Sequence, residues 1–214
     1  SKMKHLLILS IILISFSANS QNKERLLDYA EPFYSNCNSS GPTYDADDVN
    51  LVGDGYWRGE ACQAYTDSYF NSKLIMTGKV VKKFDNGQKS YEIHFKNGFA
   101  QCYRSWWHNG ELEEVGVYNN GMKDNIWEEY NREGTLVESI EYVNGKFDGY
   151  LTRWHDNGRM ESRVVYKNDK KEGEFVEYYK NGNLKRKGNY YYGNMEGRWI
   201  FYNLDGSIQG ADYY

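Results

Sequence analysis

The stretch YYKNGNLKRKGNYYYGNMEGRWIFY, residues 178–202, places two turn sequences between short segments of mixed polarity. The first turn, Asn181-Gly182, favours the primed turns that join antiparallel strands, because both central residues must adopt positive φ. The segment Leu184–Tyr191 is too short for a helix and ends next to another turn glycine, Gly193. The stretch therefore predicts antiparallel strands joined by tight turns.

The same pattern returns about every 24 residues through the second half of the chain. Four units cover residues 122–145, 146–169, 170–193 and 194–214, a shorter one covers 99–121, and a degenerate one covers 76–98. Glycine recurs at the thirteenth position of the four aligned units: Gly134, Gly158, Gly182 and Gly206. Tyrosine recurs at the twenty-first: Tyr142, Tyr166, Tyr190 and Tyr214. Agreement in phase over six units indicates a repeat array.

This array predicts an all-β fold, an elongated single-layer antiparallel β-meander built from about six two-strand repeats of ~24 residues. We expect roughly 11–12 strands. Because side chains alternate along a strand, positions 15 and 21 of a unit share one face, while positions 6 and 9 lie on opposite faces. Both faces should therefore carry aromatic rows. Wide aromatic side chains, each burying about 150–250 Å², then take the place of a closed core.

The composition agrees with many short strands and excludes other classes. Aromatic residues make up 17% of the 214 residues, 21 of them Tyr, and there are 21 Gly but 2 Pro. A disordered chain has few aromatics, and a helical bundle is rich in Ala and Leu. The net charge is −4, and removing residues 1–20, which contain two Lys and no acids, makes it 24 − 30 = −6. This balance excludes the basic footprint of a nucleic-acid-binding protein.

The pattern Y-x-x-N-G-x-L-x-x-x-x-x-Y-x-x-G-x-x-x-G-x-W-x-x-Y, which begins at Tyr178 and ends at Tyr202, resembles the MORN-repeat variant family. The residues between them that carry it are Asn181, Gly182, Leu184, Tyr190, Gly193, Gly197 and Trp199. The resemblance covers about residues 76–214 and is strongest from residue 99 onward. It implies an elongated antiparallel scaffold that binds proteins or, in some members, lipids. Antitoxin-like bacterial members add a further alternative, an antitoxin-like inhibitor protein.

Residues 1–20 have the layout of a signal peptide. Lys2 and Lys4 precede the apolar run Leu6–Phe16, and small residues follow it. The run is about half of the roughly 20 apolar residues that a membrane span needs. We therefore expect cleavage before Gln21, export to the periplasm or cell surface, and no transmembrane span after cleavage. Gln21 stands where a lipoprotein has Cys, which argues against a lipid anchor.

The segment ahead of the repeats, residues 21–75, contains no repeat unit. We expect it to cap the first edge of the array at residues 76–214, since open repeat ends need covers. An exported protein permits disulfides, and we expect a Cys37–Cys62 bridge that would staple this segment. Because the chain has three Cys, at least one thiol stays unpaired or pairs with another chain.

No group of residues predicts catalysis, a metal site or a cofactor. The cysteines lack C-x-x-C spacing, and the acidic loop at residues 45–54 lacks the glycine of a calcium loop. His108 and His155 each follow a Trp at the same repeat position, two units apart, which is too far to share a metal. The acid pairs Glu113-Glu114 and Glu128-Glu129 should each split across the two faces as solvated positions. We expect a binding protein rather than an enzyme.

The charge distribution favours a protein partner. Residues 111–148 contain ten acidic and three basic residues, whereas residues 149–190 contain six acidic and ten basic residues. Such polarity favours electrostatically steered docking of another protein. The candidate contacts are Glu128 in the acidic half and Lys185, Arg186 and Lys187 in the basic half.

The last strand of the array provides a second candidate contact. The sequence ends at position 21 of its last unit, so a strand at about residues 208–214 would leave one edge unpaired. It lacks the Lys and Pro that usually blunt such an edge. We expect a partner chain to add a strand there by backbone pairing. The candidate contacts are Ile208, Asp212, Tyr213 and Tyr214.

Together these observations predict an exported scaffold for protein–protein interaction in the cell envelope, as an accessory subunit of a larger membrane-associated assembly. Exposed aromatic residues such as Trp106-Trp107 and Tyr190–Tyr192 leave open a second function, binding of cell-wall glycan or peptidoglycan.

Overall fold

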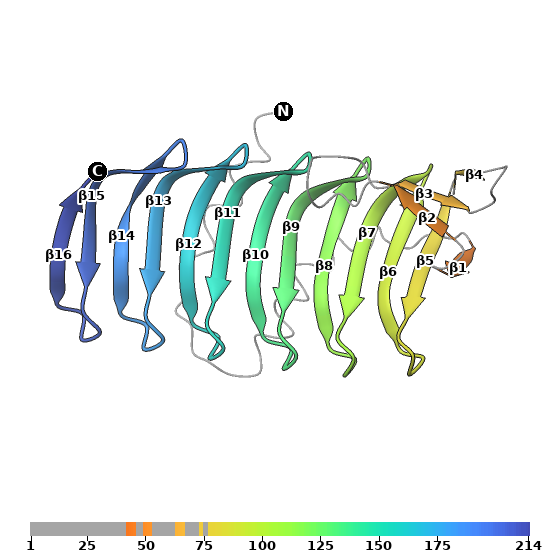
Figure 1. Cartoon of the computed structure of the whole chain (residues 1–214), viewed down its shortest axis with the longest axis horizontal. Coiled ribbons are helices and arrows are strands. Elements are labelled where there is room, and N and C mark those ends of the chain that lie inside the picture. The colour runs from red at the N-terminus through yellow and green to blue at the C-terminus, as the bar shows by residue number, and fades with distance from the viewer. Residues whose placement is uncertain (1–41, 46–48, 53–62, 67–72, 75–76) are drawn as a thin grey trace, which may run out of the picture. The chain divides into compact units, whose positions relative to one another are not determined.

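The computed structural model describes residues 42–45, 49–52, 63–66, 73–74 and 77–214 (Figure 1). Every described residue belongs to one compact unit of the chain, within residues 33–214. The described residues form strands and the turns that join them, and none forms a helix that could cross a membrane. The expected signal peptide lies outside them.

Six hairpins follow one another through the repeat region, one for each predicted unit. Their strands are β5 Thr77–Lys83, β6 Lys89–Lys96, β7 Phe99–Trp106, β8 Leu112–Asn119, β9 Met122–Tyr130, β10 Leu136–Val143, β11 Lys146–Trp154, β12 Met160–Lys167, β13 Lys170–Tyr178, β14 Leu184–Tyr191, β15 Asn194–Tyr202 and β16 Ile208–Tyr213. Four short strands precede them: β1 Thr43–Asp45, β2 Val49–Val52, β3 Gln63–Thr66 and β4 Lys73–Leu74.

Strands that are consecutive in sequence from β5 to β16 are neighbours in one sheet, and every such pair is antiparallel. Figure 1 shows them side by side in a single open layer. The predicted all-β antiparallel meander is confirmed. Its order follows from the turns, because a connection of two to five residues can only join adjacent antiparallel strands.

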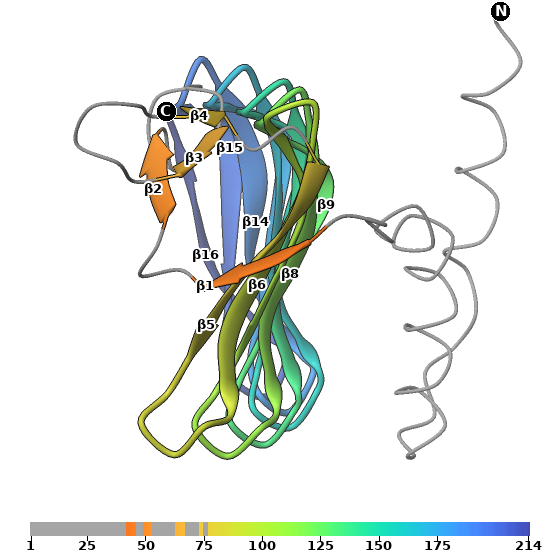
Figure 2. The ribbon, with the colours of Figure 1, turned by 90° about the vertical axis from the view of Figure 1, so that its right-hand side faces the viewer.

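The start of the array departs from the antiparallel order. β1 pairs in parallel with β5, from Thr43 opposite Lys79 to Asp45 opposite Val81 (Figure 2). Gly78 makes room for it, because a Cβ atom there would lie 2.7 Å from the carbonyl oxygen of Pro42. β3 pairs with β2 and with β4, and it also pairs with β7 at a single position. A parallel strand covers one edge of the repeat array.

Tight turns alternate with five-residue loops along the array. Asn97, Asn120 and Asn144 open the first three tight turns with φ of 52°, 50° and 50°, and a glycine with positive φ follows each. This is the primed-turn geometry that these Asn-Gly pairs predicted. The prediction is wrong for Asn181-Gly182, which lies in a five-residue loop where the glycine has positive φ and the asparagine does not. In the five-residue loops, the first N–H donates to the carbonyl of the fifth residue, as from Tyr179 to Asn183 at 2.8 Å.

One face of the sheet, called here the core face, carries the buried apolar side chains. The sixth position of the last four units supplies Trp127, Leu151, Phe175 and Trp199, all buried. Tyrosines of the twenty-first position pack between them, and the ring centroids of Tyr190 and Trp199 lie 5.1 Å apart at 80°. Each ring touches rings one or two strands away, so the core is continuous along the array.

Glycines at the nineteenth position allow the largest rings to meet across a strand. Gly188 on β14 lies between Phe175 on β13 and Trp199 on β15, whose rings stack at 5.5 Å over it. Its φ is not in the left-handed region, but a Cβ atom there would overlap the Trp199 ring. The Trp199 indole N–H donates to the carbonyl of Asn189 at 3.1 Å. The glycine is therefore required for space rather than for conformation.

The same arrangement recurs three repeat units earlier. Gly116 on β8 lies beneath the Trp127 ring, and the indole N–H donates to the carbonyl of Val117 at 2.9 Å. Where the sixth position holds a smaller residue, the nineteenth position holds a larger one, as Ile140 opposite Leu151 and Val164 opposite Phe175. The sizes of the two positions vary inversely, which keeps the core face filled.

Candidate partner-binding surface

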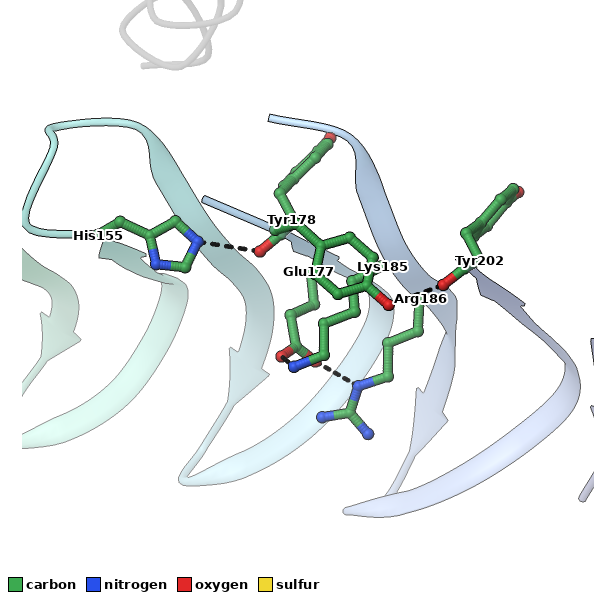
Figure 3. Close-up of polar contacts among 7 residues, drawn as sticks. His155, Glu177, Tyr178, Lys185, Arg186 and Tyr202 are labelled. Atoms are coloured by element: carbon green, nitrogen blue, oxygen red, sulfur yellow. Dashed lines mark hydrogen bonds and ion pairs between the residues drawn. The ribbon is translucent and has the colours of Figure 1, made fainter. Parts of the chain in front are cut away.

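The five-residue loops lie in a row at one end of the strands. Side chains of these loops form hydrogen bonds to the next repeat unit. The Trp107 indole N–H donates to the carbonyl of Tyr130 at 2.9 Å, and the Tyr179 hydroxyl donates to the carbonyl of Tyr202 at 2.8 Å (Figure 3). Loop asparagines do the same from Asn109 to Arg132, from Asn157 to Lys180 and from Asn181 to Leu204. Each bond spans 23 residues, so the loops are tied into one ordered row.

The prediction that His108 and His155 share a repeat position is wrong. His155 is the first residue of its loop, equivalent to Trp107, and its Nε2 lies 3.0 Å from the carbonyl oxygen of Tyr178 (Figure 3). His108 is the second residue of its loop and stacks on Phe84 with centroids 3.7 Å apart. Within the described residues, no three His, Cys, Asp or Glu side chains are placed to hold a metal ion.

The predicted basic contact, Lys185-Arg186-Lys187 on β14, is largely neutralised within the protein. Arg186 Nε pairs with Glu177 Oε2, and Lys185 Nζ lies 2.8 Å from Glu177 Oε1 (Figure 3). Burial raises the pKa of the Glu177 carboxyl, but hydrogen bonds and charges from the two cations outweigh it and hold that pKa below its ordinary value. Lys187, exposed on the face opposite the core, is the member of the triplet that remains available to a partner.

The predicted acidic contact, Glu128 on β9, is buried. Its exposed fraction is 9%, its carboxylate accepts a hydrogen bond from the Tyr130 hydroxyl at 3.0 Å, and burial raises the pKa of its carboxyl. Glu114 is 7% exposed. The prediction that these acids are solvated is therefore wrong, because a position within the sheet has neighbours on both flanking strands that cover it. Glu128 is not placed to bind a partner by charge.

Three glutamates lie directly opposite one another on the core face. Glu129 on β9 faces Glu114 on β8 and Glu138 on β10. Glu114 pairs with the buried Lys123 at 3.0 Å, and Glu138 pairs with Arg153 at 2.5 Å. Glu129 lies between them, and its pKa is raised by burial and by the charges of Glu138 and Glu114. The like charges of these three glutamates repel one another, which destabilises the middle of the array.

Glu129→Gln is expected to raise the thermal midpoint more at about pH 7 than at about pH 4. Because the folded-state pKa of Glu129 lies above its unfolded value, the folded protein binds more protons in this range. The glutamate therefore costs stability as pH rises, and the amide removes that cost. Thermal melts across pH measure the effect, with Glu133→Gln on an exposed loop as the control. A midpoint difference that does not change with pH would contradict the assignment.

The other predicted contacts lie on β16, which pairs with β15. Asp212 is opposite Trp199, and Tyr213 is opposite Arg198. Tyr213 and Ile208 are 78% and 65% exposed. A shallow hollow on this strand is lined by Phe201, Gln209, Gly210, Ala211 and Asp212. Among the described strands, β16 pairs only with β15, so its outward edge is available for backbone pairing.

Two exposed side chains at the last tight turn were not among the predicted partner contacts. Tyr191 and Tyr192 are 52% and 60% exposed, and their rings meet at 4.6 Å and 83°. Tyr192 has φ of 48° at the turn position that asparagine occupies in the four earlier turns. The replacement of Asn by Tyr at this position could have been found by aligning the five turn sequences, without the structure.

Cys102 on β7 is disulfide-bonded. Cys37 and Cys62 lie outside the described residues, so the predicted Cys37–Cys62 bridge stays a prediction. The chain has three cysteines. A bridge from Cys102 within the chain would therefore use one of the other two and compete with the predicted pair.

Comparison with solved structures finds weak likenesses to large assemblies. One is the GtfA/B complex bound to UDP and GlcNAc, at 11% identity over 66% of this chain and 24% of that chain, with a TM-score of 0.23. Another is accessory secretory protein 1,2 and 3 in Streptococcus pneumoniae, at 13% identity over 61% of this chain and 19% of that chain, with a TM-score of 0.18. The chain thus spans a quarter or less of either. No curated protein matches it.

The MORN repeat variant model matches two segments, residues 76–97 and 171–190. The first coincides with the β5–β6 hairpin and the second with the β13–β14 hairpin. The hairpins between and after them repeat the same turns, core positions and loop bonds. The chain therefore carries MORN-variant repeats at these two hairpins, and its other hairpins are similar to them.

Proposed function

We propose that the protein is an exported scaffold that binds another protein in the cell envelope, as an accessory subunit of a larger membrane-associated assembly. MORN repeats are in general protein-interaction repeats, which supports binding rather than catalysis as its role. The distribution of exposed apolar side chains carries the proposal. Of the nine large hydrophobic side chains exposed among the described residues, six lie in residues 191–214: Tyr191, Tyr192, Leu204, Ile208, Tyr213 and Tyr214.

Exposed apolar side chains concentrated in one part of a protein mark interaction sites. Here they follow the basic half of the array, and Lys187 lies exposed on β14, the strand that also carries Tyr191. Lysines beside an apolar surface accelerate encounter with an acidic partner, while the apolar contacts supply affinity. The acidic half has fewer exposed apolar side chains, and two of its charged residues, Glu114 and Glu128, are buried.

A four-site variant tests the proposal. Tyr191, Tyr192, Leu204 and Tyr213 are replaced together by Ser, and capture from the native envelope fraction is compared with the wild type. We expect the wild type to retain one protein partner and the variant to lose it. The matched control replaces Ile126, Val143 and Tyr150, exposed in the third and fourth units, by Ser. Equal capture by all three proteins, or none by the wild type, would contradict the proposal.

Export has its own test. The charged and apolar layout of residues 1–20 motivates it. The intact mass of the protein isolated from its source cell should correspond to an N-terminus within a few residues of Gln21. A native protein that retains residues 3–20 would show that it is not processed as proposed.

Glycan binding is the second candidate function. The exposed ring pair Tyr191–Tyr192 supports it, because sugar rings stack on exposed aromatic side chains. Co-sedimentation with purified peptidoglycan in the absence of any protein partner would favour this function over the first.

A further inference from the structure

The last tight turn contains a residue that its backbone disfavours. Asn97, Asn120, Asn144 and Asn168 open the first four turns with φ between 47° and 52°, and Tyr192 opens the fifth with φ of 48°. Asparagine tolerates the left-handed region, whereas a bulky side chain there is an outlier that costs stability. The fifth turn is therefore strained where the others are not.

The surrounding structure holds this turn in place. The Tyr192 N–H donates to the Glu172 carboxylate at 3.0 Å, and the Gly193 N–H donates to the carbonyl of Lys171 at 2.9 Å. The third turn is held in the same way, with the Asn144 N–H donating to Asp124 at 3.1 Å. The backbone conformation thus comes from contacts common to the array, and the tyrosine side chain is not needed for it.

The contacts of the Tyr192 side chain lie at the surface of the protein. Tyr192 is 60% exposed, and its ring touches that of Tyr191 edge-on, so the two perpendicular rings form an exposed corner. Lys170 Nζ lies 5.3 Å from the Tyr192 ring centroid and is exposed at the rim of the corner. An apolar corner with a cation at its rim suits an apolar side chain that is followed or preceded by an acidic one. Strain held at an exposed site points to a function outside the fold.

We propose that the corner formed by Tyr191, Tyr192 and Lys170 is the primary contact for the partner protein, which packs an apolar side chain against the exposed surfaces of the two rings and places a carboxylate near Lys170. This inference rests on the proposed function and adds the site and the chemistry of the partner's contact. It predicts that stability and binding change in opposite directions at Tyr192. A residue with a purely structural role would change both in the same direction.

The experiment uses the full chain in its source cell with a photo-crosslinker. Asn194→benzoylphenylalanine places the probe beside the corner, since Asn194 is exposed and lies opposite Tyr191. We expect one protein adduct. Tyr192→Asn in this background should lower the adduct yield at least about tenfold, as expected for an interface anchor, and raise the thermal midpoint by a few degrees. Asn144→Tyr, the matched control in the third turn, should lower the midpoint and leave the adduct unchanged.

Several outcomes would overturn the inference. An adduct that survives Tyr192→Asn would show that the corner is not the contact. If the four-site variant still loses the partner in that case, the proposed function is supported and only the position of the contact is wrong. A lower midpoint for Tyr192→Asn would show that the tyrosine is structural. An adduct of carbohydrate rather than protein would assign the corner to glycan binding. No adduct with the wild-type corner, together with no capture from the envelope, would overturn both proposals.

Discussion

Gly188→Ala is expected to lower the free energy of unfolding by about 3 kcal/mol, the upper range for overpacking a core. The added methyl group would occupy the space of the Trp199 ring, which lies against Gly188 and is fully buried. Moving that ring would also break its hydrogen bond to Asn189 and its stacking on Phe175. Denaturant melts followed by intrinsic tryptophan fluorescence measure the loss.

Gly210→Ala is the matched control, because Gly210 also lies within a strand and a Cβ atom there meets nothing within 4 Å. It should leave the midpoint almost unchanged. The double variant Gly188→Val/Trp199→Phe reproduces the Val164 and Phe175 combination of the preceding units. It should recover at least about 1 kcal/mol relative to the sum of the single changes. Additive single changes would show that the two positions do not share one space.

Glu114→Ala is expected to destabilise the protein by about 3–5 kcal/mol, the range for removing one partner of a buried ion pair. Lys123 is 1% exposed, and its Nζ lies 3.0 Å from Glu114 Oε1 and 3.6 Å from the Trp127 ring centroid. Without Glu114 the lysine would lose the carboxylate that lies 3.0 Å from its Nζ, at a position that is almost fully buried. Equilibrium unfolding in denaturant measures the change.

Asp156→Ala removes the carboxylate of an exposed pair with Lys180 and serves as the control. It should leave the midpoint unchanged, since exposed pairs contribute little. Lys123→Met combined with Glu114→Gln should restore much of the loss, because the site is then neutral and still filled. A loss for Glu114→Ala no greater than that for Asp156→Ala would contradict the burial of the pair.

The order of the strands was predictable because it depends on local signals. Asn-Gly pairs at Asn120 and Asn144 specify the turn, and the turn specifies the neighbour. The match between Gly188 and Trp199 was not predictable in the same way, because it depends on register across two strands. β1 also escaped prediction, since it is three residues long and joins β5 without a tight turn.

The candidate contacts were less predictable than the fold. A run such as Lys185–Lys187 indicates basic charge, but only the pairing of β14 with β13 brings Glu177 against two of its members. The burial of Glu128 also depends on neighbouring strands. The exposure of Tyr191 and Tyr192 depends on the turn, and the five aligned turns did contain that information.

Cross-linking mass spectrometry of the native protein with its partner tests the central claim most directly, that this is a protein-binding array whose C-terminal half makes the contact. A lysine-reactive reagent on the intact envelope reports which lysines lie near another protein. The account predicts cross-links between one partner protein and the lysines of residues 167–187, including Lys170 and Lys187. Cross-links confined to the lysines of residues 79–146, or none to another protein, would contradict it.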